Sequence, residues 1–481
     1  MTPITPPRTA PLPAPTPPQL QAALQAQGVH RIECAMADFT SIARGKLVSA
    51  ADFLAAGGCK LPTVLLGMGV TGTAPPALFG SLLPQAYGDM QLVPDLQTLV
   101  PRPGRPGEAT VLCEPQGRWL APLYGYEIDA SALSPRAALR RVLADAAAMG
   151  LQACVAPELE LFLLQRVEGP DGAHLDSARA SPGAPARESA CEHYSLERCT
   201  QFEPFFDALY AACAQQAIPL TGHLHEAAFS QFELNFAPGA PLAQADAVFR
   251  FKRLARELAA RHGFLASFAA KPFADQPGTG MHWHVSLQHS AAGNVAHPAA
   301  AAAWPHVFAT PDGASTAALS HFIAGLQAHV PAAMALLAPY DMAFDRIRMS
   351  DASPTHADWA EEDRHVAFRV PASGASARRV ENRLPGGDVN PYLMLALTLA
   401  AGLAGLRAAV PATPGRSDAQ RLPRCLPTAL DALSASRFAR DSLGDPLVDL
   451  FVALKRHEHA ERQALADPRQ DWDLRHLIEL A

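Results

Sequence analysis

The segment Ala156-Pro-Glu-Leu-Glu-Leu-Phe162 alternates acidic and apolar residues within a longer run of Leu, Phe and Val. Successive side chains of a β-strand point to opposite faces, so a strand here places Glu158 and Glu160 on one face and the leucines on the other. A Glu-x-Glu pair by itself is most often a solvated face, but the flanking positions here are apolar. The segment therefore predicts a strand that aims two carboxylates into one space.

Three further segments place polar groups in a similar apolar setting. His282 and His284 repeat the two-residue spacing around Trp283, and Glu381 stands two residues before Arg383. A lone His-x-His is more often structural than ligating, so the prediction depends on the segments occurring together. The three segments are His225-Glu-Ala-Ala-Phe-Ser-Gln-Phe-Glu233, Gly278-Thr-Gly-Met-His-Trp-His284 and Arg378-Arg-Val-Glu-Asn-Arg383.

Converging carboxylates are costly to bury unless cations or arginines neutralise them. Five carboxylates and one imidazole suit two divalent ions, and the imidazole makes a purely calcium-type site less suitable than one for Mg²⁺ or Mn²⁺. The sequence therefore predicts a two-metal phosphoryl-transfer site. Its carboxylates would be Glu158, Glu160, Glu226, Glu233 and Glu381, together with one histidine of these segments.

The composition is that of a globular enzyme with two or three domains: 481 residues, 49% apolar and 18% charged. A formal charge of -7 offers no basic surface for nucleic acid. Local clustering of arginines in an acidic chain indicates a small anionic ligand, with phosphate the obvious candidate. The clustered residues are Arg364, Arg369, Arg378, Arg379 and Arg383.

Eight scattered cysteines without a CxxC pair indicate reduced thiols, a cytoplasmic location and no zinc site. The apolar stretch Tyr392 to Leu406 is short for a membrane span, so we expect a buried helix and no membrane partner. Asn390 and Pro391 stand where an N-cap and a first-turn proline would begin that helix.

Composition divides the chain into a disordered proline-rich tail (1–18), a small mixed α/β domain (19–117) and a large domain (118–481). Ser134-Pro predicts the start of a helix that ends at Gly150. We further expect a helix from Ala243 to His262, a strand from Leu265 to Lys271, and a charged helical part after Asp418. A surface loop is expected from Gly169 to Glu188, and an irregular flap from Asp341 to Asp363.

The residues of these motifs, and their order along the chain, resemble the glutamine synthetase family over most of the chain. Lys271-Pro-Phe, followed by the segment from Gly278 to Leu287, resembles the ATP-site stretch of the family. Arg379-Val-Glu-Asn-Arg-Leu-Pro, with Asn390-Pro-Tyr, resembles its glutamate-site stretch. Asp38 to Lys46 and Pro94 to Thr98 are most similar to the branch that makes γ-glutamyl derivatives of polyamines and other amines.

The resemblance implies a role for each matching residue. Glu160, Glu226 and Glu233 would hold one metal, and Glu158, His282 and Glu381 the nucleotide-side metal. Gly278, Arg346 and Arg383 would bind glutamate, and His284 and Ser286 would line the nucleotide. Arg364, Arg369 and Arg379 would contact the nucleotide phosphates or the transferring phosphoryl group, and Arg346 and Arg364 are expected to act in catalysis.

The resemblance also implies an α+β fold, with a β-grasp-like N-terminal domain before a catalytic domain built on antiparallel strands. Subunits of the family usually form a dodecamer of two stacked hexameric rings, so a homo-oligomer is expected. The implied reaction is phosphorylation of the γ-carboxylate of glutamate by ATP, followed by attack of an amine. Metals and arginines must neutralise the two anions before they can approach, which explains a site without an activated Ser or Cys.

Two departures from the family bear on the acceptor. Ammonia-using members carry an Asp-Gly-Ser-Ser element, whereas Leu65 to Thr71 contains no carboxylate. Alignment from Arg346 puts Ala352, with Asp351 beside it, at the place of the catalytic glutamate. We therefore expect a larger organic amine as acceptor. Two alternatives are an ammonia-using glutamine synthetase and a catalytically silent homologue that binds nucleotide or assembles into rings. A metal-dependent amidohydrolase is a remote third alternative.

Overall fold

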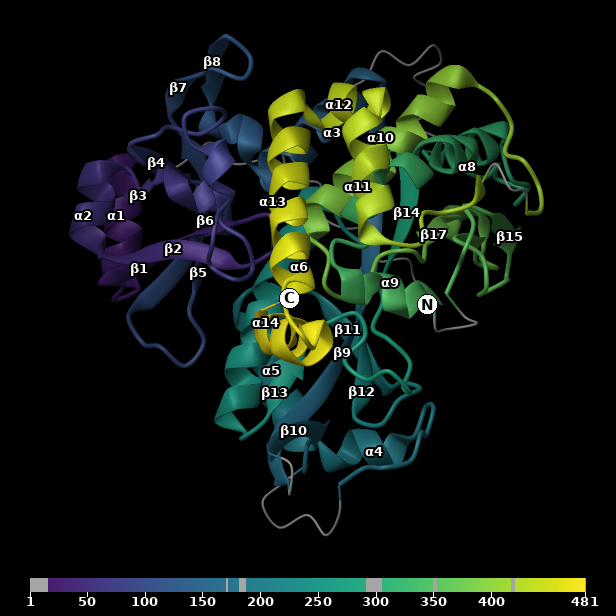
Figure 1. Cartoon of the computed structure of the whole chain (residues 1–481), viewed down its shortest axis with the longest axis horizontal. Helices are drawn as coiled ribbons and strands as arrows, with labels where there is room; N and C mark the ends of the chain where they lie inside the picture. The colour runs from purple at the N-terminus through teal and green to yellow at the C-terminus, as the bar shows by residue number, and fades with distance from the viewer. Residues whose placement is uncertain are drawn as a thin grey trace.

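The computed structural model describes residues 16–169, 172–180, 187–290, 305–348, 353–416 and 420–480 (Figure 1). The expected tail lies outside these residues except for its last three. Pro17 and Pro18 already form the first turn of helix α1 (Pro17–Ala26), a position where a missing backbone N–H has no cost. Helix α1 therefore begins two residues before residue 19, where the sequence places the start of the N-terminal domain.

The N-terminal domain contains a six-stranded sheet in the order β2-β1-β6-β4-β3, with β5 beside β6. Strands β1 and β6 run parallel, while the other pairs run antiparallel. This is the β-grasp-like arrangement that the sequence predicts, and α1 and α2 lie beside it (Figure 1). The elements are β1 (Arg31–Ala37), β2 (Ala43–Ser49), α2 (Ala50–Ala56), β3 (Cys59–Pro62), β4 (Asp89–Pro94), β5 (Val100–Pro101) and β6 (Glu108–Gln116).

The catalytic domain is built on a nine-stranded sheet in the order β11-β12-β9-β14-β17-β16-β15, with β10 and β13 also paired to β9. The long strand β9 contains both glutamates of the opening segment. Apart from the parallel pair β15 and β16, the strand pairs of this nine-stranded sheet are antiparallel. The strands are β9 (Leu151–Gly169), β10 (Gly172–Ser177), β11 (Leu220–His225), β12 (Gln231–Phe236), β13 (Leu265–Ser267), β14 (Met281–His289), β15 (Trp359–Glu361), β16 (Phe368–Val370) and β17 (Val380–Asn382).

Along the chain, the segment between the two sheets forms a small hairpin, β7 (Arg118–Ala121) and β8 (Tyr126–Asp129), and helix α3 (Pro135–Ala148). The Ser134 hydroxyl accepts a hydrogen bond from Ala137 N at 3.2 Å, which confirms the predicted N-cap. The other helices are α4 (Leu196–Gln201), α5 (Glu203–Gln215), α6 (Pro241–Arg261), α8 (Ala317–His329), α9 (Asp341–Arg348), α10 (Pro391–Ala408), α11 (Leu426–Ala435), α12 (Arg437–Leu443), α13 (Asp445–Gln463) and α14 (Leu474–Leu480). Short helical turns are η1 (Thr63–Gly67), η2 (Pro76–Leu78), η3 (Leu96–Thr98), η4 (Ala130–Leu133), η5 (Pro331–Leu336), η6 (Ala375–Ala377) and η8 (Arg469–Asp473).

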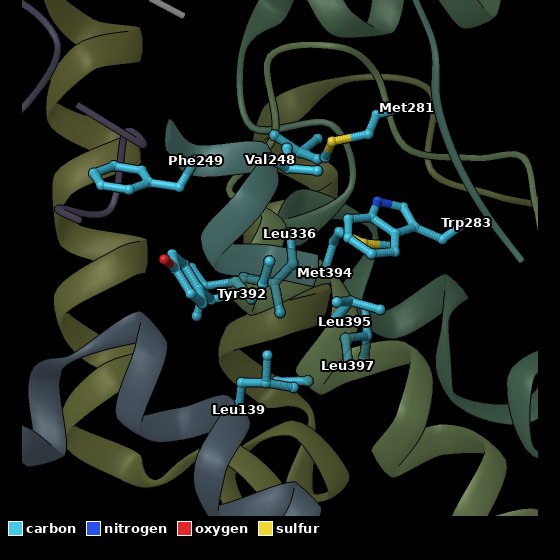
Figure 2. Packing of buried hydrophobic residues seen from close by; sticks show 14 of the residues in the cluster. Leu139, Val248, Phe249, Met281, Trp283, Leu336, Tyr392, Met394, Leu395 and Leu397 are labelled. Carbon is cyan, nitrogen blue, oxygen red and sulfur yellow. The ribbon is translucent and has the colours of Figure 1, made fainter. Parts of the chain in front are cut away.

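The main core lies on one face of the catalytic sheet. Met281 and Trp283 of β14 meet Leu336 and the apolar side chains of α3, α6 and α10 there (Figure 2). The histidines that alternate with Met281 and Trp283 must face the other way. Burying one face of the sheet under helices therefore leaves the polar groups of the same strands on the opposite face.

Helix α10 is long and apolar enough to span a membrane by length and composition, yet 78% of it is buried inside the protein. Its N-cap is Asn390, whose Oδ1 accepts from Tyr392 N at 3.0 Å, as predicted. This helix is thus the central core helix of a globular domain, which agrees with the sequence interpretation.

Two expected irregular segments contain regular structure. The interval 169–188, expected as a loop, includes β10, which pairs with the end of β9. The interval 341–363, expected as a flap, begins with helix α9, which buries Met342, Phe344 and Ile347. These residues give α9 an apolar face. The charged residues between and around them make this pattern hard to recognise in the sequence.

Candidate active site

The strand register gathers the predicted carboxylates on one face of the sheet. In β12 and β9, Glu233 lies directly opposite Glu160. In β9 and β14, Glu158 lies directly opposite His282. Opposite residues of an antiparallel pair share a face, and Glu158 and Glu160 share theirs because they are two apart. The structure therefore brings Glu158, Glu160, Glu233 and His282 together on one face of the sheet.

The same face continues across the next two strands. His284 of β14 lies opposite Glu381 of β17, and Glu381 lies opposite Arg369 of β16. Arg369 donates through Nη1 to Glu381 Oε2 at 2.8 Å, and Arg383 donates through Nη1 to Glu381 Oε1 at 2.5 Å. The Glu381 side chain is fully buried, so the two guanidinium groups supply the counter-charge that a buried carboxylate requires.

A second chain of contacts runs through the histidines. Arg379 Nε donates to His284 Nδ1 at 3.1 Å, so the other ring nitrogen, Nε2, carries the hydrogen and donates to Glu158 Oε1 at 2.8 Å. Burial raises the pKa of Glu158, but the hydrogen bond from His284 and the charges of Arg383 and Arg364 outweigh it, and the net shift is downward. Glu158 is therefore held in its ionised form.

The other end of the face carries an excess of negative charge. Burial and the nearby charges of Glu226 and Glu233 raise the pKa of Glu160. Burial and the charge of Glu158 raise the pKa of Glu233 to about 7, although Asn235 donates to its carboxylate at 2.9 Å. Carboxylates held this close repel one another until a proton or a cation neutralises them. The donor set fits a hard divalent cation.

Glycine shapes the centre of the site. A Cβ atom on Gly280 would lie 2.6 Å from His282 Nε2, 2.9 Å from Glu160 Oε1 and 3.2 Å from Arg346 Nη2. These three polar groups thus converge on the space left by the missing side chain. At Gly278 a Cβ atom would lie 2.3 Å from the carbonyl oxygen of Ala270, so only glycine fits there.

Arg346 enters this space from α9. Its Nη1 donates to the carbonyl oxygen of Leu384 at 2.9 Å and its Nη2 to that of Arg383 at 3.3 Å. The side chain is buried, and burial lowers the pKa of Arg346 from the ordinary arginine value. The helix expected as a flap therefore carries a fixed cation into the site.

Among the described residues, two groups of three have ligand atoms within 4.8 Å of one another, namely Glu158, His284 and Glu381, and Glu158, Glu233 and His282. Both include Glu158, and neither coincides with a ligand set implied by the resemblance. The assignment of individual ligands to two ions accordingly stays a prediction. What the geometry supports is a carboxylate and imidazole site for at least one divalent cation.

The remaining predicted residues lie around this centre. Ser286 continues the row of His282 and His284, and its hydroxyl donates to the carbonyl oxygen of Cys154 at 3.4 Å. Arg364 is exposed, and its carbonyl oxygen accepts from Arg383 Nε at 3.1 Å. Ala352 and Asp351 lie outside the described residues.

The segment from Leu65 to Thr71, which begins within the turn η1, is bound to helix α13. Val70 N donates to Glu458 Oε1 at 2.7 Å, and the Thr71 hydroxyl donates to Glu461 Oε2 at 3.0 Å. Sequence reasoning did not reveal this attachment, because α13 is separated from the loop by almost the whole chain. Gln231, Asn235 and Gly280 were also missed, although each stands within or beside a quoted motif.

A β-grasp-like domain joined to an antiparallel sheet with a face of carboxylates and arginines is the architecture of an ATP-dependent carboxylate–amine ligase. Residues 132–476 match the family described as "Glutamine synthetase, catalytic domain". The chain therefore belongs to the glutamine synthetase family.

Among curated relatives, the γ-glutamylputrescine synthetase PuuA of Escherichia coli is 31% identical over 73% of this chain and 70% of its own length. The glutamate–isopropylamine ligase of a Pseudomonas species is 27% identical over 95% of this chain and 96% of its own. Among solved structures, the complex of GmaS with ADP superimposes with a TM-score of 0.74 at 25% identity, covering 95% of this chain and 98% of that one.

Proposed function

We propose that this protein joins the γ-carboxylate of glutamate to a primary organic amine, with ATP as the phosphoryl donor and γ-glutamyl phosphate as the intermediate. The observation that carries the proposal is the single polar face on which five strands place carboxylates, histidines and arginines within contact of one another. Such a face carries the arginines and cation-binding carboxylates that can neutralise two reacting anions. The opposite face of the sheet is apolar.

In this proposal Arg346 and Arg383 bind glutamate, together with the backbone at Gly278. Both side chains are buried at the centre of the face, and the carbonyl oxygen of Arg383 accepts from Arg346. Arg364, Arg369 and Arg379 lie along the β16 and β17 side, where they would hold the nucleotide phosphates and the group in transfer. His284 and Ser286 would line the nucleotide.

Divalent cations, Mg²⁺ or Mn²⁺, would be held by the carboxylates and by His282, and would neutralise the phosphates during transfer. We propose two such sites, with Glu160, Glu226 and Glu233 at one and Glu158, His282 and Glu381 at the other. Burial and the neighbouring carboxylates raise the pKa values of Glu160 and Glu233, which supports a cation between them, because a bound cation would neutralise this buried negative charge.

The reaction then follows from positioning and charge. A γ-carboxylate oxygen of glutamate attacks the γ-phosphorus of ATP, and the bond from phosphorus to the β,γ-bridging oxygen breaks to release ADP. The amine nitrogen next attacks the acyl carbon and loses a proton, and phosphate leaves with the former carboxylate oxygen. The arginines stabilise charge that develops on the phosphoryl oxygens.

An organic amine is favoured over ammonia by two facts. The loop from Leu65 to Thr71 carries no carboxylate to bind an ammonium ion, and the names of two curated relatives specify putrescine and isopropylamine as acceptors. We also propose a cytoplasmic location, supported by eight cysteines that are all free, and a ring-shaped homo-oligomer of the kind usual in the family.

The acyl phosphate step is tested with glutamate that carries ¹⁸O in its γ-carboxylate. With ATP and a primary amine, the released phosphate should contain one ¹⁸O atom for each amide formed. Amide formation with unlabelled phosphate would contradict an acyl phosphate intermediate. Absence of both products with every amine tested would favour a silent homologue that only binds or assembles.

A further inference from the structure

Gln231 is the first residue of β12. Inside the site, its side-chain amide makes hydrogen bonds through both its oxygen and its nitrogen. Its side chain is 1% exposed. Its Oε1 accepts from Ala228 N at 3.0 Å, while its Nε2 donates to Glu160 Oε2 at 2.9 Å and to the carbonyl oxygen of Gly278 at 3.0 Å. One buried side chain thus joins the turn after Glu226, a predicted cation ligand and a predicted glutamate-binding glycine.

These bonds determine which oxygen of Glu160 is available. Oε2 accepts from Gln231 Nε2 and also from Gly280 N at 2.9 Å, so it already has two donors. Oε1 has no hydrogen-bond donor among the described residues, and it lies on the space above Gly280 where His282 Nε2 and Arg346 Nη2 also converge. The carboxylate is therefore oriented with one oxygen anchored and the other presented.

The chemistry of the position favours an amide over the side chains of similar size. A glutamate here would set a second carboxylate beside Glu160 and would lose the donor. A methionine would fill the space but leave the Glu160 oxygen with one donor and Ala228 N without its acceptor. Only an amide of this length supplies a donor to one side and an acceptor to the other.

We propose that Gln231 is the positioning residue that presents Glu160 Oε1 to a divalent cation and that fixes Gly278 and the Glu226 turn relative to it. This inference rests on the cation assignment in the proposed function. Residues that orient a metal ligand commonly change metal affinity by about 10- to 100-fold when they are replaced. Gln231 should therefore act on cation binding even when no nucleotide or glutamate is present.

The test measures Mn²⁺ binding to the full chain by calorimetry without nucleotide. Gln231→Met should weaken at least one Mn²⁺ site by about tenfold or more. The matched control is Gln244→Met, because Gln244 is also buried and its Nε2 donates to the carbonyl oxygen of Ala237, away from the cation ligands. The control should bind Mn²⁺ with an affinity close to that of the wild type.

A cycle with Glu160→Gln distinguishes positioning from a general loss of structure. If Gln231 acts through Glu160, Gln231→Met should weaken Mn²⁺ binding in the wild-type background and have little further effect in the Glu160→Gln background. If the methionine variant does not fold, Gln231→Leu, which also lacks the amide and adds no charge, replaces it, with the same expected loss.

Unchanged Mn²⁺ affinity in a folded Gln231 variant would overturn the inference and leave the proposed function standing. Equal losses in both backgrounds would also overturn it. Failure of the wild type to bind Mn²⁺ would overturn the cation assignment and the inference together. Weakened binding that depends on Glu160, in a protein that ligates no amine, would support the inference and contradict the proposed function.

Discussion

Arg383 makes one of the shortest ion pairs of the site, at 2.5 Å to Glu381, and also bonds the carbonyl oxygen of Arg364. A lysine could keep the charge but could not make both contacts and also hold a carboxylate with a planar fork. We expect Arg383→Lys to weaken the binding of glutamate by about 1.5 to 3 kcal/mol, the usual contribution of hydrogen bonds to charged groups. Steady-state kinetics with varied glutamate measures the change.

Arg378→Lys is the control for that experiment. Arg378 neighbours Arg379 but directs its guanidinium to the Ser315 hydroxyl and the carbonyl oxygen of Gly313, outside the polar face. It should leave the glutamate dependence unchanged. If Arg383→Lys also leaves the glutamate dependence of the rate unchanged, Arg383 does not bind the substrate.

Glu160 is predicted to be needed for turnover but not for stability. The elevated pKa of this carboxyl means that ionisation is less favourable in the folded protein than in the unfolded chain, so its charge destabilises the metal-free fold. Glu160→Gln should therefore abolish ADP release while the free energy of unfolding, measured in urea without metal, stays equal or rises. Near wild-type turnover in this variant would show that Glu160 is not a cation ligand.

At the scale of elements, helices α8 and α10 approach each other closely at glycine residues. A Cβ atom on Gly325 would lie 2.0 Å from the carbonyl oxygen of Ala401 and 2.7 Å from Gly405 N, so the two backbones would have to separate. We expect Gly325→Ala to lower the free energy of unfolding by about 1 to 3 kcal/mol. Urea denaturation tests this, with Gly374→Ala as a neutral control because a Cβ atom on Gly374 would have no neighbouring atom within 4 Å. Equal stability of both variants would contradict the packing argument.

The elements that carry the site were predictable because their patterns are local. The alternation around Glu158 and around His282 specifies strands, and Ser134 and Asn390 mark helix starts by their capping chemistry. The wrong predictions also have local causes. Charged residues surround the apolar face of helix α9 and make its segment resemble a flap, while the segment of β10 resembles a loop because it contains few β-branched residues.

Strand order and register could not be predicted from these patterns. The sequence indicates that Glu233, Glu160 and His282 face a common space, but only the pairing of β12, β9 and β14 shows which groups are opposite one another. The same applies to Gln231, whose Nε2 donates to two residues that lie 71 and 47 positions away along the chain. Contacts of this kind depend on tertiary packing, about which periodicity carries no information.

For the whole molecule, the excess of carboxylates in one place predicts stabilisation by divalent cations. A ligand that binds only the folded state stabilises it by about 2.7 kcal/mol at a concentration about 100 times its Kd. Mg²⁺ or Mn²⁺ should therefore raise the melting temperature of the wild type, and raise that of Glu160→Gln less. Differential scanning calorimetry without nucleotide measures both, and a shift that is the same in the two proteins would place the cation elsewhere.

Hydrogen bonds join the N-terminal domain to the catalytic domain at two points. Asn390, at the start of α10, donates to the carbonyl oxygen of Asp38, and Glu458 of α13 accepts from Val70 in the loop that lacks an ammonium-binding carboxylate. The Glu458 carboxylate is itself paired with Lys455 at 2.8 Å. The loop is thus anchored by its backbone, and Leu65 to Val70 offer no side-chain charge to a small cation.

The most direct measurement is therefore of ADP release with ATP, Mg²⁺ and glutamate, comparing primary organic amines with ammonium at equal concentration. Ammonium would lose its hydration shell with little in return, whereas an alkyl amine could gain about 0.8 kcal/mol for each methylene that it buries. The account predicts substantial ADP release with at least one organic amine and much less with ammonium. Equal or greater release with ammonium would contradict it and identify an ammonia-using glutamine synthetase.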